Sequence, residues 1–333
     1  MTHSIAVLGS GSWGTALAVH LARTGHDVRL WARDPALAAA MAAQRENGAY
    51  LPGIELPSAL TPASELAPAL DGAAFVVMAV PSHGVRDVSR AAAAQMPPGC
   101  TMVSAVKGLE AGSLLRMSQV LRGELPDIGD IVVLSGPSFA LELARELPTA
   151  VVAAGESAAV VESVMAHFRS PALRLYGSAD VTGVELGGSL KNIIAIAAGV
   201  VEGLGLGHNA LAALMTRGLA ELSRLAVACG AQRETLAGLA GLGDLVLTCT
   251  GDLSRNRKVG IELAHGRSIT DILARTRMVA EGVRTTDAAL ALSAKHGIEL
   301  PIAQEMSDVL AGRTDPKSAI RNLMGRKQKL EHA

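Results

Sequence analysis

A glycine-rich run near the start of the chain has the spacing of a phosphate-binding loop. Gly9, Gly11 and Gly14 form the pattern G-x-G-x-x-G between an apolar run, residues 5–8, and a helical pattern, residues 15–22. In such a loop the first glycine permits a tight turn, the second lets the backbone approach a pyrophosphate, and the third lets the helix pack against the strand. The N–H groups and the dipole at the helix start favour an anion. We therefore predict a dinucleotide site rather than a simple turn.

The end of the second expected strand bears on which dinucleotide binds. Arg33 and Asp34 follow that strand, residues 27–31. An acidic residue about 20 positions after the loop is usual for a cofactor without a 2′-phosphate. Arg33 instead suits a 2′-phosphate through its charge and its bidentate guanidinium group. Because Asp34 can accept a hydrogen bond from a ribose hydroxyl, NADP(H) and NAD(H) both stay open, and a simply solvated Arg33 is the alternative.

Lys191 is the candidate proton donor. A carbonyl reduction needs an acid that protonates the oxygen as hydride arrives. The residues after Lys191 are almost wholly apolar, so we expect a buried helix, with Gly187 and Gly188 on the same face. Glycine inside a helix costs about 1 kcal/mol relative to alanine, and we interpret this face as kept open for a ligand. Burial and a nearby cation would lower the Lys191 pKa towards neutrality; a structural lysine that reaches solvent is the alternative.

Two further segments follow expected strands. Lys107 follows residues 100–104, at the carboxyl end of the sheet, where ligands bind in open α/β folds. An exposed loop lysine is the alternative. Gly136 and Ser138 follow residues 131–134 and open an expected helix. Ser138 fits an ordinary helix cap, and the same geometry fits a backbone that binds a ligand.

Residues 254–258, Ser-Arg-Asn-Arg-Lys, are the densest basic cluster of the chain. Guanidinium groups beside a hydroxyl and an amide can clamp a phosphate or a carboxylate, and a solvated loop is the alternative. Asp244 lies ten residues before Ser254. Its carboxylate could pair with Lys191, accept from a substrate hydroxyl, or cap a helix.

Alternating strands and helices must position these residues. The expected strands are residues 4–8, 27–31, 73–80, 100–104, 131–134 and 150–153. The expected helices between them are residues 14–24, 35–45, 83–95, 113–122 and 138–145. This alternation predicts a Rossmann-like, doubly wound sheet, and residues 73–80, apolar on both faces, suit a central parallel strand.

Helical periodicity replaces the strand signal after residue 180, which predicts an all-α second domain. We therefore divide the chain into a nucleotide-binding domain, residues 1–180, and a substrate domain, residues 181–333, with the active cleft between them. The expected helices are residues 209–229, 268–275, 285–295, 302–310 and 316–330. In the first of these, Asn209 is the expected N-cap, leucines 211, 214, 222 and 225 form the buried stripe, and Arg217 and Glu221 form an i,i+4 ion pair.

Composition limits the remaining classes of function. The 333 residues carry a formal net charge of −1, which argues against a general nucleic-acid or membrane-surface binder. The three cysteines lie far apart without C-x-x-C spacing, so we expect reduced thiols, no metal site and a cytoplasmic location. The start of the chain lacks the basic region of a signal peptide, and the longest apolar run, residues 193–201, is too short for a membrane span.

Seven short motifs resemble the bacterial-type, soluble NAD(P)-dependent glycerol-3-phosphate dehydrogenases, in the family's order and over almost the whole chain. They are Gly9-Ser-Gly-Ser-Trp-Gly-Thr-Ala-Leu-Ala18, Lys107-Gly-Leu-Glu110, Gly136-Pro-Ser-Phe-Ala140, Leu190-Lys-Asn192, Gly241-Leu-Gly-Asp244, Ser254-Arg-Asn256 and Val279-Ala-Glu-Gly282. Ser189 is a departure, because the family commonly has alanine there. The resemblance implies reversible hydride transfer between NAD(P)H and C2 of dihydroxyacetone phosphate, giving sn-glycerol 3-phosphate for glycerophospholipid synthesis.

The resemblance also implies roles for individual residues, with Lys191 as the catalytic acid and base. The cofactor residues that it implies are Gly9, Gly11, Ser12, Trp13, Gly14, Arg33, Lys107, Ala140, Arg255, Val279 and Glu281. The substrate residues that it implies are Lys107, Gly136, Ser138, Lys191, Asp244, Ser254, Arg255 and Asn256. It also suggests a homodimer.

Two other functions fit parts of the same pattern. Reductases of hydroxy acids or of ketopantoate share the two-domain plan and a lysine on the interdomain helix, but would not need residues 254–258 to bind a phosphate. A non-catalytic NADP(H) sensor would need only the nucleotide loop, and the full set of catalytic-type residues argues against it. Inhibition by glycerol phosphate and oxidation of the cofactor separate these possibilities.

Overall fold

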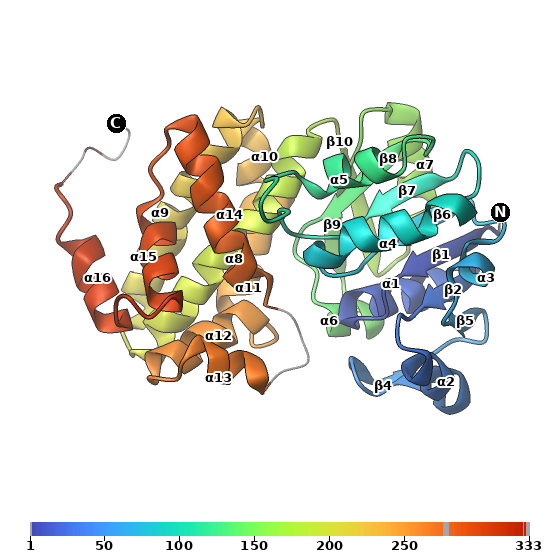
Figure 1. Ribbon diagram of the computed structural model, residues 1–333, viewed down its shortest axis with the longest axis horizontal. Coiled ribbons are helices and arrows are strands. Elements are labelled where there is room, and N and C mark those ends of the chain that lie inside the picture. The colour runs from blue at the N-terminus through green and yellow to red at the C-terminus, as the bar shows by residue number, and fades with distance from the viewer. Residues whose placement is uncertain (1, 276–279, 329, 331–333) are drawn as a thin grey trace.

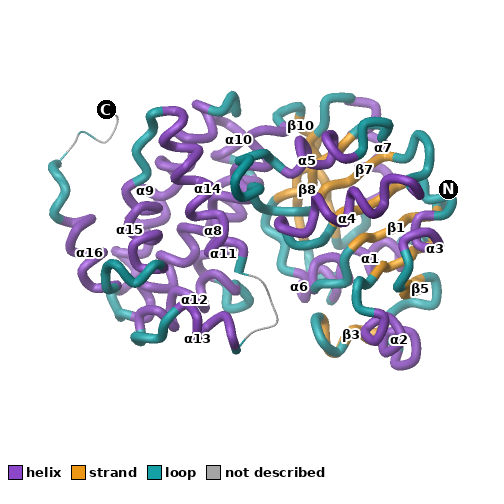
Figure 2. Tube along the Cα trace, in the orientation of Figure 1, coloured by secondary structure: helices purple, strands orange, loops and turns teal. Residues whose placement is uncertain are grey.

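The computed structural model describes residues 2–275, 280–328 and 330 (Figure 1). The first part of the chain, the α/β part, builds a sheet with helices on both faces. The second, the helical part, contains only helices among its described residues (Figure 2). The strands are β1 (Ser4–Leu8), β2 (Asp27–Trp31), β3 (Glu46–Asn47), β4 (Leu51–Glu55), β5 (Leu60–Ala63), β6 (Phe75–Met78), β7 (Thr101–Ser104), β8 (Ile131–Ser135), β9 (Thr149–Ala154) and β10 (Leu173–Ser178).

Helices connect these strands and form the whole of the helical part. In the α/β part they are α1 (Ser12–Arg23), α2 (Pro35–Gln44), α3 (Leu66–Leu70), η1 (Ser82–Gly84), α4 (Val85–Ala92), η2 (Ala93–Gln95), α5 (Met117–Glu124), α6 (Ala140–Ala144) and α7 (Ala158–Phe168). In the helical part they are α8 (Val181–Gly203), α9 (Gly207–Ala228), α10 (Arg233–Ala237), η3 (Leu239–Gly243), α11 (Asp244–Thr250), α12 (Arg255–Ala264), α13 (Ile269–Ala274), α14 (Glu281–His296), α15 (Pro301–Leu310) and α16 (Pro316–Met324).

The main sheet is doubly wound and mostly parallel, as the sequence predicts. Its strand order is β10-β9-β8-β7-β6-β1-β2-β5, with β1 in the interior. At one end the direction changes, which the sequence did not specify: β9 pairs antiparallel with β8, and β10 then runs parallel to β9. The edge strands β5 and β10 were not predicted, because neither has the continuous apolar run of a strand covered on both faces.

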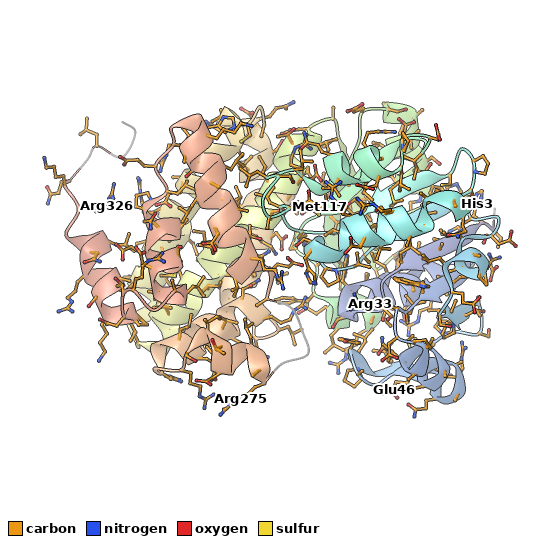
Figure 3. The ribbon with its side chains drawn as sticks, viewed as in Figure 1. His3, Arg33, Glu46, Met117, Arg275 and Arg326 are labelled. Carbon is orange, nitrogen blue, oxygen red and sulfur yellow. The ribbon has the colours of Figure 1, made fainter. Side chains whose placement is uncertain are left out.

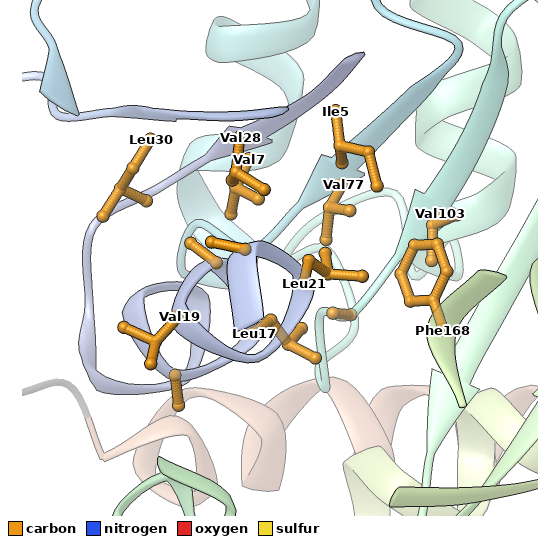
Figure 4. Packing of buried hydrophobic residues seen from close by; sticks show 14 of the residues in the cluster. Ile5, Val7, Leu17, Val19, Leu21, Val28, Leu30, Val77, Val103 and Phe168 are labelled. Atoms are coloured by element: carbon orange, nitrogen blue, oxygen red, sulfur yellow. The ribbon is translucent and has the colours of Figure 1, made fainter. Parts of the chain in front are cut away.

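Alternate residues of the central strands fill two separate cores. Ile5 and Val7 point towards α1 and α7, where they pack with Leu17, Leu21 and Phe168 (Figure 4). On the opposite face, Ala6, Leu8, Val76 and Met78 pack beneath α3, α4 and α5. Because the side-chain direction alternates along a strand, one short apolar segment can serve both faces. The carboxyl ends of β1, β6, β7 and β8 are thereby fixed side by side.

The central helix of the helical part is α8, which packs against α9, α11, α12 and α14. Its residues from Gly183 to Val201 are all buried. With 23 residues, α8 is long and apolar enough to cross a membrane, although its longest unbroken apolar run, residues 193–201, is too short to do so alone. The most apolar stretch of α8 is, however, wholly buried inside the protein. We therefore describe α8 as a core helix, whose depth removes any side chain it carries from bulk water.

Several helix ends differ from the prediction. The first long helix after α8 begins at Gly207 with Leu206 as its N-cap, so Asn209 is not the cap. Glu221 is buried and does not pair with Arg217 among the described residues; its carboxylate accepts from the Ile302 N–H at 3.1 Å and so caps α15. Helices expected at residues 83–95, 113–122, 138–145, 285–295 and 316–330 are observed as η1-α4-η2, α5, α6, α14 and α16 with shifted ends.

Candidate active site

Two lysines from different parts of the fold meet on one buried carboxylate. Lys107, from the loop after β7, places its Nζ 2.7 Å from Asp244 Oδ2. Lys191, in the middle of α8, donates through Nζ to Asp244 Oδ1. Asp244 is the first residue of α11 and is 1% exposed, and Lys191 is 5% exposed. Of the three roles open to Asp244, the structure shows the pairing with Lys191 and adds Lys107 as a second partner.

The environment of Lys191 lowers its pKa to about 8. Burial is the main cause, and the positive charge of Lys107 acts in the same direction, whereas Asp244 opposes both. The direction of this shift is the one expected from the sequence. A lysine in this state is still protonated at neutral pH, yet it can release its proton far more readily than a solvated lysine.

Thr248 completes the surroundings of Lys191, and sequence reasoning did not identify it. Its Oγ1 accepts from Lys191 Nζ at 2.6 Å and donates to the Asp244 carbonyl oxygen at 2.6 Å. Thr248 follows Asp244 by four residues on α11, so both lie on one helix face. That i,i+4 spacing was the signal that could have identified it.

The segment from Gly136 to Ser138 lies against Lys107. Lys107 Nζ donates to the Gly136 carbonyl oxygen at 2.9 Å and lies 3.2 Å from Ser138 Oγ, which itself donates to Gly136 at 2.9 Å. Helix α6 begins at Ala140 with Phe139 as its N-cap, so Ser138 is not the cap. Gly136 has φ 139°, a conformation that L side chains rarely adopt.

The two glycines before Lys191 serve close packing, which corrects the interpretation of an open face. A Cβ on Gly187 would lie 2.7 Å from the Ala240 carbonyl oxygen. A Cβ on Gly188 would lie 2.3 Å from Ser135 Oγ and 3.5 Å from Lys107 Cγ. Protein atoms therefore fill this face, and the absence of side chains brings α8 close to the loop of Lys107.

In the basic segment, residues 254–258, one of the two arginines is already paired with carboxylates of the protein. Arg257 pairs with Glu202 at 2.6 Å and with Asp252 at 3.0 Å, so its charge is neutralised, which corrects its assignment to a clamp. Ser254 is buried and caps α12 by accepting from the Arg257 N–H at 3.2 Å. Arg255 is exposed and forms no ion pair within the described ranges. Arg255 is thus the guanidinium of this segment that can meet an anion.

Asn256 and Glu281 connect α14 to its neighbours. Asn256 Nδ2 donates to Asn192 Oδ1 at 2.9 Å, and its Oδ1 accepts from the Gly282 N–H at 3.0 Å. Glu281, the first residue of α14, accepts from Ser82 of the α/β part. Val279, which the sequence resemblance assigns to the cofactor, lies outside the described residues.

The glycine-rich loop has the predicted conformation. Gly9 has φ 118°, and a Cβ there would lie 2.8 Å from the backbone of Ala79. A Cβ on Gly14 would lie 1.9 Å from the Gly9 carbonyl oxygen, whereas one on Gly11 meets no atom within 4 Å. Gly11 is the N-cap of α1, and no side chain among the described residues caps this helix. The space beside Gly11 is thus open, which fits the approach of a pyrophosphate to the backbone of the loop.

Other predicted cofactor residues surround this loop. Ser12 Oγ donates to the Tyr50 carbonyl oxygen at 2.7 Å, and Trp13 packs half-buried against the core beneath α1. Ala140, half-buried, begins α6. Arg33 is exposed on the side that faces the helical part (Figure 3). Asp34 caps α2 by accepting from the Ala36 N–H at 2.9 Å.

Comparison with known proteins identifies the family of the chain. Models of the NAD-dependent glycerol-3-phosphate dehydrogenase N-terminus and C-terminus match residues 4–161 and 180–321. Proteins named glycerol-3-phosphate dehydrogenase (NAD(P)+) are similar over nearly the full length: that of Acidobacterium capsulatum is 53% identical and covers 97% of this chain and 98% of its own. That of Citrifermentans bemidjiense is 50% identical, with 99% of each chain covered.

A solved structure shows the same fold. The crystal structure of glycerol-3-phosphate dehydrogenase from Coxiella burnetii superposes with a TM-score of 0.94 at 41% identity, covering 98% of this chain and 99% of that one. Two family models together match most of the chain, and full-length relatives are about half identical to it. The chain therefore belongs to the NAD(P)-dependent glycerol-3-phosphate dehydrogenases, which are oxidoreductases that act on a CH–OH group.

Proposed function

We propose that this enzyme interconverts dihydroxyacetone phosphate and sn-glycerol 3-phosphate, with Lys191 as the general acid and base, and that it supplies glycerophospholipid synthesis in the cytoplasm. The observation that supports this role is the buried Lys191 ammonium, held by Asp244 and Thr248, with a pKa of about 8. In this proposal residues 1–180 bind the nucleotide, residues 181–333 supply most of the substrate contacts, and the enzyme is a homodimer.

The bound nicotinamide supplies or accepts the hydride at C2 of the substrate. Lys191 Nζ holds the proton that the carbonyl oxygen needs during reduction, and takes it back during oxidation. Asp244 and Thr248 fix the direction of Nζ, because each accepts one of its N–H donors. The ammonium has three donors, so one remains for the substrate oxygen.

The substrate phosphate needs a cation that is not already neutralised. Arg255 meets this condition, and its guanidinium can donate to two phosphate oxygens. Ser254 and Asn256 flank it, although both hydroxyl and amide also support α12 and α14. Lys107 contacts Gly136, Ser138 and the second oxygen of Asp244, and in this proposal these residues bind the hydroxyl end of the substrate.

The cofactor residues follow the glycine loop and the opposite wall. Gly9, Gly11 and Gly14, with Ser12 and Trp13, would hold the pyrophosphate region. Arg33 would face the 2′-phosphate of NADP(H), and NAD(H) would bind with less charge complementarity. The remaining cofactor residues in the proposal are Lys107, Ala140, Arg255, Glu281 and Val279.

Oxidation of NADPH in the presence of dihydroxyacetone phosphate tests this proposal directly. Lys191→Ala is expected to lose most of kcat while NADPH binding survives, because the side chain holds the proton and not the dinucleotide. Near-normal turnover of Lys191→Ala would refute the assignment. Turnover of a hydroxy acid or of ketopantoate in place of the phosphorylated substrate would favour the first alternative, and NADPH binding without turnover would favour a sensor.

A further inference from the structure

One serine of the α/β part holds a carboxylate of the helical part. Ser82 begins η1, the next element after β6, and Glu281 begins α14, 199 residues later. Glu281 Oε1 accepts from the Ser82 N–H at 3.0 Å, and Glu281 Oε2 accepts from Ser82 Oγ at 2.6 Å. Ser82 is 5% exposed. Both carboxylate oxygens are therefore fixed by a single residue from the opposite part of the fold.

The loop that carries Lys107 packs directly on this pair. A Cβ on Gly108 would lie 2.4 Å from Ser82 Cβ, 2.8 Å from Ser82 Oγ and 3.3 Å from Glu281 Oε2. Only glycine fits such an approach without movement of its neighbours. We call Ser82, Gly108 and Glu281 the interdomain latch. The latch joins the start of η1, the loop of Lys107 and the start of α14.

The latch also lies close to the glycine-rich loop. β6 pairs in parallel with β1, which leads into that loop. Gly9 packs against the backbone of Ala79 and Val80, two to three residues before Ser82. The carboxylate of Glu281 is thus fixed near the nucleotide loop, although its own helix belongs to the helical part.

We propose that Ser82 is a positioning residue for the cofactor: it holds the Glu281 carboxylate in one orientation, in which the remaining lone pairs accept hydrogen bonds from a ribose hydroxyl of the dinucleotide. This inference rests on the cofactor role proposed above for Glu281. A carboxylate has about four acceptor sites, and the Ser82 N–H and Oγ–H use two of them. Because the latch orders the side chain in advance, binding of the cofactor need not do so.

Ser82→Ala tests the inference in the full-length enzyme. Loss of a hydrogen bond to a charged acceptor is expected to raise the KM and the Kd for NADPH about tenfold, with kcat within about twofold of the parent. Ser89→Ala is the matched control, because Ser89 is a buried serine of α4 whose hydroxyl has no hydrogen-bond partner among the described residues. If Ser82→Ala fails to fold, Ser82→Cys keeps the shape with a weak donor and is expected to raise the KM in the same way.

Non-additivity separates positioning from a purely structural effect. If Ser82 acts through Glu281, Ser82→Ala adds no further loss of NADPH binding in a Glu281→Ala background. The inference is overturned if the two losses multiply, or if Ser82→Ala changes the KM no more than Ser89→Ala while Glu281→Ala raises it. If Glu281→Ala itself leaves the KM for NADPH unchanged, the proposed cofactor role of Glu281 fails, and the positioning role fails with it.

Discussion

Replacement of Asp244 by Asn is expected to lower the Lys191 pKa and to destabilise the fold. Asp244 is 1% exposed and accepts from both Lys191 and Lys107, so the variant leaves two ammonium groups against a buried amide. Removal of one partner of a buried ion pair costs about 3–5 kcal/mol. Asp244 also opposes the lowering of the Lys191 pKa by burial and by Lys107. Without it, the pKa is expected to fall below 8 by about 1–3 pH units.

The pH dependence of kcat for carbonyl reduction measures this change. Lys191 must carry its proton to act as the acid, so reduction is fastest below its pKa and declines as the pH rises through it. In the parent enzyme the alkaline decline is expected near pH 8. In Asp244→Asn the decline is expected at lower pH, with a lower urea midpoint at each pH.

Asp252→Asn is the matched control for the loss of a carboxylate. Asp252 pairs with Arg257, but its side chain is 94% exposed, so the variant should change neither the alkaline decline nor the urea midpoint. The reasoning is refuted if a folded Asp244→Asn enzyme keeps its decline near pH 8, or if the control shifts the decline as far.

Three further changes test other parts of the structure. Arg33→Asp should raise the KM for NADPH about tenfold more than the KM for NADH, because a carboxylate repels the 2′-phosphate; equal rises would contradict that role. Burial raises the Glu221 pKa to about 7, so its stabilising protonation is present below pH 4.5 and is lost as the pH rises through 7. Glu221→Gln should therefore raise the free energy of unfolding by on the order of 3 kcal/mol at pH 8 and change it little at pH 4. Thermal unfolding at both pH values measures this, and an increase in Tm that does not depend on pH would argue against the reasoning. Gly188→Ala, whose Cβ would meet Ser135 Oγ at 2.3 Å, should cost about 1–3 kcal/mol in urea denaturation, and Ser135→Gly should restore part of it; no cost would contradict the packing.

Local sequence patterns identify residues whose function depends on their own backbone or immediate neighbours. Within six residues, Gly9 permits a turn, Gly11 leaves space beside the backbone, and Gly14 allows α1 to contact the Gly9 carbonyl oxygen. Lys191 is conspicuous because the helix around it is apolar, and the cost of burying a charge there implies a partner. The sequence could therefore predict the loop conformation and the direction of the Lys191 pKa.

Contacts between distant segments could not be predicted in the same way. Thr248 joins the site because α11 presents it beside Asp244, and the position of α11 relative to α8 depends on tertiary packing. Glu221 has the spacing of an exposed ion pair with Arg217, yet its carboxylate caps α15, 81 residues later. The reversal of β9 is equally nonlocal, since its apolar pattern fits either strand direction.

The burial of α8 has a consequence for how the chain folds while it is being synthesised. Every helix that packs along α8 in the helical part, among them α9, α11, α12 and α14, follows it in the sequence. During synthesis α8 therefore leaves the ribosome about a hundred residues before the last helix that packs on it, α15, is complete. Its apolar surface must stay exposed, or be held by a chaperone, for several seconds at about 5–20 residues per second. Slow translation after α8 should thus reduce the yield of folded enzyme without any change in its final stability.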